Sequence, residues 1–312
     1  MNLYVVLGSA IVGLLVGMTG AGGGALMTPM LILLFNVKAS TAISSDLVAA
    51  VAMRPFGAAV HAQRKTVNYS IVGWLAMGAA PAAFFGAWVL SQMSHAKAAT
   101  ANVEKALGAA LLLGAAAMAL RYILDRRSDN PRTGALDSVA IRPVPTLLAG
   151  VVGGIVVGLT SVGSGSLLIV MLMFIYPSLS AKRLVGTDLT QAIPLTAAAA
   201  LGALAFGHVQ LPLTAAIIAG SVPAVLLGSF LSSRTTDRFL RPVIFCVVLA
   251  SGLKYAGFGT YDLAWGVGVA VTVILADHLW TRARRSRTVT KSETAERYRE
   301  LSAAVANGQI AQ

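Results

Sequence analysis

Two glycine-rich stretches interrupt otherwise apolar sequence, and they lie about 141 residues apart. The first covers residues 17–24 (Gly-Met-Thr-Gly-Ala-Gly-Gly-Gly), and the second covers residues 158–165 (Gly-Leu-Thr-Ser-Val-Gly-Ser-Gly). Each glycine costs a helix about 1 kcal/mol relative to alanine, so a continuous helix through either stretch is unfavourable. We therefore expect a helix to break at each stretch.

The composition places these breaks in a membrane. The chain has 312 residues, of which 56% are hydrophobic and only 12% charged, and its mean hydropathy is +0.76. A soluble domain carries roughly twice that share of charge. Apolar runs of about twenty residues recur along the chain, which predicts an all-α, polytopic integral membrane protein. Lipid offers no partners to freed backbone groups, so each break must be buried in protein or line a watery cavity.

The apolar segments divide into two sets. They are 4–19, 25–35, 42–62, 71–92 and 103–121, then 145–161, 165–176, 185–205, 212–231 and 238–256, with a further one at 263–280. Segments 25–35 and 165–176 are too short to cross a hydrocarbon core of about 30 Å as straight helices. We expect each to pair with the preceding span as a broken helix or hairpin. The predicted parts are a first transmembrane repeat (1–124), a polar cytoplasmic loop (125–144), a second repeat (145–256), an extra helix (257–280) and a basic cytoplasmic tail (281–312).

The two halves repeat each other in sequence. Identical residues recur at an offset of 141, in the pairs Gly13/Gly154, Gly17/Gly158, Thr19/Thr160, Gly22/Gly163, Gly24/Gly165 and Met30/Met171. Further along, they recur at an offset of 142, in the pairs Asp46/Asp188, Leu47/Leu189, Val67/Val209, Gly78/Gly220, Pro81/Pro223, Gly86/Gly228 and Ser91/Ser233. The basic tail belongs in the cytoplasm because cytoplasmic loops are rich in Lys and Arg. Counting membrane passes back from the tail gives the two halves opposite orientations in the membrane if each short segment makes one pass. The halves have the same orientation otherwise. Paired breaks in two halves point to a transporter's substrate site.

The short helices that follow the breaks suggest an anion site. Their N-termini present N–H groups and the positive end of a helix dipole, which together bind anions. The hydroxyls of Thr19, Thr28, Thr160, Ser161, Ser164 and Ser166 could add donors. The predicted substrate-binding residues are Gly20, Gly22, Gly23, Gly24, Arg54, Ser161, Gly163, Ser164, Gly165 and Gln191. The alternative is close helix packing through small residues.

Arg54 lies near the centre of segment 42–62. A cation there is costly, so it should face a cavity or a partner. Its planar fork suits a sulfonate, sulfite or carboxylate group. The alternative is a structural ion pair, for example with Asp46, although eight residues of helix separate the two by about 12 Å. The repeat partner of Arg54 is Thr196, so the site would be asymmetric.

Asp46 and Asp188 occupy equivalent positions and are candidates for ion coupling. A carboxylate inside a membrane can take up a proton or coordinate Na⁺ during transport. The alternative is a carboxylate near a helix start, favoured by capping and by the dipole.

Other functional classes find little support. Cys246 is the one cysteine, which excludes a disulfide within the chain and a cysteine-based metal site. We see no nucleophile–base set, no phosphate loop and no metal spacing, so we expect neither an enzyme nor a cofactor. The net charge of +12 fits cytoplasmic loops and tail better than nucleic acid. A secondary transporter with a small anion as its substrate is the favoured function, and a homodimer is an open possibility. A passive anion channel and a membrane scaffold or sensor remain as alternatives.

The same residues carry a resemblance to a known family. Residues 20–24 with Pro29, the block Ala42-Ile-Ser-Ser-Asp46-Leu47, and Lys65-Thr-Val67 are similar to the motifs of the TauE/SafE transporters, named for sulfite and sulfoacetate export. The second half offers 163–165, 185–189 and 207–209, with Ser164 and Val170 departing from the pattern. The resemblance covers about 1–257. It implies transport of a small organosulfur or related anion across the cytoplasmic membrane.

Overall fold

The fold was determined as a computed structural model, which describes residues 3–19, 23–63, 67–95, 99–127, 140–163, 165–179, 181–232 and 237–259, together with 268 and 272. The chain forms two compact units, Met1–Leu263 and Ala264–Gln312. Nearly all described residues belong to the first unit. The predicted segment 263–280 and the basic tail lie outside the described residues, apart from 268 and 272.

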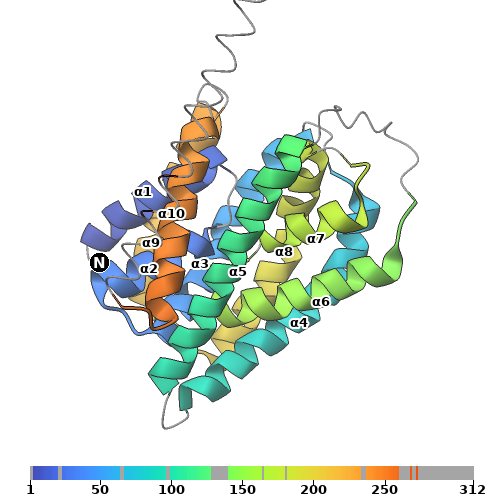
Figure 1. Cartoon of the computed structure of the whole chain (residues 1–312). Helices are drawn as coiled ribbons and strands as arrows, with labels where there is room; N and C mark the ends of the chain where they lie inside the picture. The colour runs from blue at the N-terminus through green and yellow to red at the C-terminus, as the bar shows by residue number, and fades with distance from the viewer. Residues whose placement is uncertain are drawn as a thin grey trace, which may run out of the picture. The chain divides into compact units, whose positions relative to one another are not determined.

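The described part of the first unit consists of α-helices joined by short turns and loops, without a strand (Figure 1). Its elements are α1 (Leu3–Thr19), α2 (Gly24–Phe35), α3 (Ala39–Gln63), α4 (Tyr69–His95), α5 (Ala99–Arg127), α6 (Pro143–Thr160), α7 (Leu167–Ile175), α8 (Ala181–Phe206), α9 (Leu211–Ser232) and α10 (Asp237–Tyr255). Among the described residues, five stretches are long and apolar enough to cross a membrane, namely Tyr69–Ser94, Ala101–Leu124, Pro143–Thr160, Arg183–Phe206 and Leu211–Ser229. The all-α, polytopic membrane fold is therefore confirmed.

Short helices follow both glycine-rich stretches. Helix α2 has 12 residues and begins at the last residue of its stretch, and α7 has nine residues and begins two residues after its stretch. The second break is built from left-handed backbone, with φ of 60° at Ser161, 114° at Gly163 and 100° at Gly165. Glycine adopts such angles without the steric penalty that other residues incur, which is why this stretch requires glycine. In the first stretch α1 ends at Thr19 and Gly23 caps α2, while residues 20–22 lie outside the described part.

Glycines allow helices of the two halves to touch backbone to backbone. Helix α4 packs along α6, and a Cβ atom at Gly78 or Gly154 would collide with the carbonyl oxygen of Leu147 or Ala79 respectively (Figure 1). Helix α1 packs along α9 in the same way, with Gly220 against the carbonyl oxygen of Val6. Small residues at such contacts are how membrane helices approach closely.

These contacts are reciprocal between positions that the repeat relates. Gly86 meets the carbonyl of Ile155, and Gly228 meets that of Leu14. Hydrogen bonds repeat the pattern: the Asn68 N–H donates to Thr187 Oγ1 (3.1 Å), and the Gln210 N–H donates to Ser45 Oγ (3.2 Å). Each half thus supplies the other with a hydroxyl acceptor at the equivalent position.

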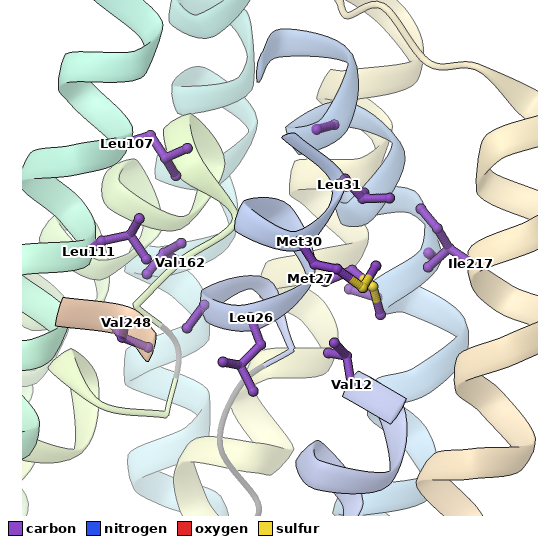
Figure 2. Packing of buried hydrophobic residues seen from close by; sticks show 14 of the residues in the cluster. Val12, Leu26, Met27, Met30, Leu31, Leu107, Leu111, Val162, Ile217 and Val248 are labelled. Atoms are coloured by element: carbon purple, nitrogen blue, oxygen red, sulfur yellow. The ribbon is translucent and has the colours of Figure 1, made fainter. Parts of the chain in front are cut away.

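Helix α2 is embedded in protein. Every residue from Gly24 to Leu31 is buried. In Figure 2, its Leu26, Met27, Met30 and Leu31 lie among apolar side chains from other helices, including Val12, Leu107, Leu111, Ile217 and Val248. The packing places the N-terminus of α2 inside the unit, where its N–H groups are shielded from lipid.

The outer surface is apolar instead. Helix α4, for example, exposes Trp74, Met77, Phe85 and Trp88, and α9 exposes Leu211, Leu227 and Leu231. Large exposed apolar side chains on long helices are typical of a face in contact with lipid tails.

Gly78→Ala should destabilise the protein, because the added methyl group meets the backbone of α6. Overpacking of this kind costs about 1–3 kcal/mol, so the thermal midpoint of the purified protein in detergent should fall. Gly73→Ala is the matched control in the same helix, since nothing lies within 4 Å of its Cβ position. It should leave the midpoint unchanged or raise it; equal losses in both variants would contradict the close α4–α6 contact.

Candidate functional site

The two glycine-rich stretches meet in space. A Cβ atom at Gly24, the first residue of α2, would collide with the backbone oxygen of Ser161, the C-cap residue of α6. The N-cap residue Gly23 accepts hydrogen bonds from the N–H groups of Leu26 and Met27 (3.1 and 2.9 Å). The start of α2 in the first half therefore abuts the left-handed turn of the second half.

Asp46 binds both the helix that follows the first stretch and a residue of the second stretch. Its Oδ2 accepts one hydrogen bond from Thr28 Oγ1 of α2 (2.9 Å) and one from Ser161 Oγ (2.8 Å). The carboxylate is fully buried, as is the Thr28 side chain. The other oxygen, Oδ1, has no hydrogen-bond partner in the described part of the chain. One carboxylate thus links α3 and α2 of the first half to the second half.

Asp188 lies at the equivalent position of α8 and has different partners. Its Oδ1 accepts a hydrogen bond from Gln191 Nε2 (3.3 Å), and the Gly165 N–H also donates to its carboxylate. Both side chains are fully buried. Asp188 Oδ2 and Gln191 Oε1 lack hydrogen-bond partners within the described ranges. Buried polar atoms are nearly always paired, so such atoms mark a place where a ligand, an ion or water can bind.

Arg54 connects the two carboxylates electrostatically. It is buried in α3 with only 8% of its surface exposed, and it interacts first with Asp188 and second with Asp46. The ion pair with Asp46 within α3, which was the alternative interpretation of Arg54, is therefore the weaker of its two carboxylate interactions. The stronger one crosses from the first half to the second. A buried guanidinium with two carboxylates is a costly arrangement that membrane proteins keep mainly at functional sites.

A second arginine reaches this cluster. Arg121 of α5 interacts with Asp188, and it was not among the residues predicted from the sequence. Its position at the end of the apolar segment 103–121 suggested a span boundary, but α5 continues to Arg127. The helix-forming residues that follow Arg121 were the sequence signal that could have placed this arginine inside a helix.

The helix-capping alternative for the two aspartates is wrong. Asp46 and Asp188 are each the eighth residue of their helices, α3 and α8, so neither lies at a helix start. Their hydrogen bonds go to other elements or to the following turn. Both carboxylates accept hydrogen bonds from side chains in the interior of the protein.

The remaining predicted residues divide into two groups. The structure brings together Gly23, Gly24, Asp46, Ser161, Gly165, Asp188, Gln191 and Arg54, with Gly163 in the same turn. Gly20, Gly22 and Ser164 lie outside the described residues. Two hydroxyls are used elsewhere: Thr160 bonds the carbonyl of Val156 (2.6 Å), and Thr196, the counterpart of Arg54, bonds that of Ala192 (2.7 Å). The charged cluster is consequently asymmetric.

Comparisons with known proteins place the chain as a whole among membrane transporters. Residues 5–255 match the sequence profile of the family described as "Sulfite exporter TauE/SafE". The chain is similar to the probable membrane transporter protein YjnA of Bacillus subtilis, with 38% identity over 81% of this chain and 99% of the relative. It is also similar to the probable membrane transporter protein YdhB of the same organism, with 24% identity over 80% and 98%. No solved structure matches at a significant level.

Thr28→Val should destabilise the protein more than Thr196→Val does. Both side chains are buried, but Thr28 donates to a carboxylate and Thr196 only to its own helix. Loss of a hydrogen bond to a buried charge costs about 1–3 kcal/mol, and the thermal midpoint in detergent should fall accordingly.

A double-mutant cycle assigns that cost to the pair. In an Asp46→Asn background, the effect of Thr28→Val should shrink, because the charged acceptor is already gone. Full additivity of the two substitutions would show that the Thr28 hydroxyl does not stabilise the protein through Asp46.

Proposed function

Because the chain belongs to the TauE/SafE family of membrane transporters, we propose that it moves a small anion, sulfite or a sulfonate, across the cytoplasmic membrane by alternating access. The observation that carries the proposal is the buried cluster of Arg54, Asp46 and Asp188 at the junction of the two glycine-rich breaks. The family's description supplies the substrate class, and the chemistry of the cluster is suited to it.

The cluster offers two kinds of group to an anion. The Arg54 guanidinium presents several N–H donors in a plane and can bind two oxygens of a sulfite or sulfonate at once. The N-terminus of α2 adds the positive end of a helix dipole at Gly24, next to Ser161. We infer that substrate binds between these groups, with Gln191 as a further donor or acceptor.

Alternating access needs two parts that move relative to each other. The reciprocal glycine contacts and hydrogen bonds support a two-fold relation between the halves 1–124 and 145–256. An inverted relation would place both breaks near the middle of the bilayer, as in other secondary transporters. In this proposal Asp46 is a contact that changes when the halves move, because its hydrogen bonds join the first half to the second. The basic tail then lies in the cytoplasm.

Transport in proteoliposomes tests the proposal, with sulfite and methanesulfonate as substrates. Arg54→Ala should reduce flux at least about tenfold, because loss of a buried charged partner costs about 2–5 kcal/mol. Lys254→Ala is the control, since it removes an equal charge from an exposed position on α10. Size-exclusion profile and thermal midpoint report whether each variant inserts and folds. Undiminished flux in folded Arg54→Ala would remove Arg54 from the substrate site.

A further inference from the structure

The two buried carboxylates, Asp46 and Asp188, differ in the charge of their partners, and this difference separates their roles in coupling. We propose that Asp46 carries the coupling proton, while Asp188 stays ionised as the counter-charge of Arg54, so that one proton moves with each monovalent anion. This inference rests on the proposed function and adds to it the identity of the coupling ion and of its carrier.

Asp188 is surrounded by positive charge and by strong donors. Arg54 and Arg121 both interact with it, and the Gln191 amide and the Gly165 N–H donate hydrogen bonds to it. A carboxylate with two guanidinium groups nearby is stabilised in its ionised form. Removing its charge would leave Arg54 buried with only its weaker carboxylate partner, which is unfavourable.

Asp46 is held mainly by neutral groups. Among the described residues, its hydrogen-bond donors are the hydroxyls of Thr28 and Ser161 and its one charged neighbour is Arg54, whose stronger interaction is with Asp188. Of the helices packed against α3, the described α2, α6 and α9 carry no titratable side chain, and α4 has Tyr69 and His95 at its ends. Helix α8 contributes Asp188 and carries Lys182 and Arg183 in its first turn. Helix α5, whose other charged side chains lie toward its two ends, reaches the cluster through Arg121. Little positive charge therefore holds Asp46 in its ionised form.

Charge balance then gives the stoichiometry. Two carboxylates and two guanidinium groups leave the empty cluster neutral. A bound monovalent anion adds one negative charge, which a membrane interior accepts only if it is compensated. A proton that binds Asp46 Oδ1 restores neutrality and leaves both hydrogen bonds to Oδ2 in place. Asp188 also has an oxygen without a hydrogen-bond partner among the described residues, so it is the charge of the partners that separates the two residues.

Protonation would also loosen the contact between the halves. The Ser161 hydroxyl of the second half donates to Asp46 of the first. A hydrogen bond to an ionised acceptor is roughly twice as strong as one to a neutral acceptor. The loaded, protonated cluster thus holds the halves together less tightly than the empty, ionised cluster does. Such a difference couples the proton to the movement of the transporter.

Transport driven by a pH gradient tests the stoichiometry. Methanesulfonate is the probe because it carries one charge and does not titrate near neutral pH. A gradient of one pH unit should give about tenfold accumulation in proteoliposomes containing the wild-type protein, as expected for one proton per anion. Asp46→Asn should lose this accumulation while counterflow of labelled methanesulfonate remains measurable. Asp188→Asn should lose both, because Arg54 loses its main counter-charge. Wild-type accumulation in Asp46→Asn would overturn the assignment.

Infrared spectroscopy of the detergent-solubilised protein identifies the protonated group without any substrate. The C=O stretch of a protonated carboxyl that titrates with pH should vanish in Asp46→Asn and persist in Asp188→Asn. If Asp46→Asn does not fold, Ser161→Ala should shift this band and Gln191→Ala should not, since the two donors serve different carboxylates. The opposite pattern would assign the proton to Asp188. Absence of sulfite and methanesulfonate flux in the wild type would refute the proposed function, and the infrared titration would still decide which carboxylate binds the proton.

Discussion

Direct contact between glycine backbones and carbonyl oxygens across the two halves holds this structure together. Within lipid there is no hydrophobic driving force for helices to associate, so membrane helices depend on close packing and on polar contacts. Gly78 and Gly154 bring α4 and α6 together, and Gly220 does the same for α1 and α9. Each pair joins a helix of one half to a helix of the other. The halves are therefore interlocked, and the two glycine-rich breaks are brought to the same place.

That meeting point determines the chemistry of the interior. The start of α2 lies against Ser161, and the Ser161 hydroxyl bonds Asp46. Ionised groups are tolerated in such a place only when the protein supplies their partners. Two hydroxyls donate hydrogen bonds to Asp46, which also interacts with Arg54, whereas Asp188 interacts with two arginines and accepts hydrogen bonds from an amide and a backbone N–H. Two aspartates at equivalent positions of a repeated sequence thereby acquire different environments, because Arg54 has Thr196 as its counterpart.

Much of the fold could be predicted from local sequence. The presence and order of the helices follow from long apolar runs, although polar residues extend helices such as α5 beyond the predicted ends. Residues such as Gly163 and Gly165 predict breaks because they suit left-handed backbone. The repeat offsets pointed to Asp46 and Asp188 as a pair, and both are buried in the cluster. Arg121 escaped notice, because a cation at the end of an apolar run looks like the edge of a span until the following helix is seen.

By itself, the sequence determined the membrane fold, the two breaks and the polar residues inside the spans, since each depends on composition and on neighbours along the chain. Tertiary structure alone decided which partners those residues have. Ser161 reaches Asp46 across 115 residues, and Asp188 is the stronger carboxylate partner of Arg54 although Asp46 shares its helix. The physical reason is that such pairs arise from how the helices of the two halves pack. The spacing of residues along the sequence cannot show whether a helix packs against helices of its own half or against helices of the other half.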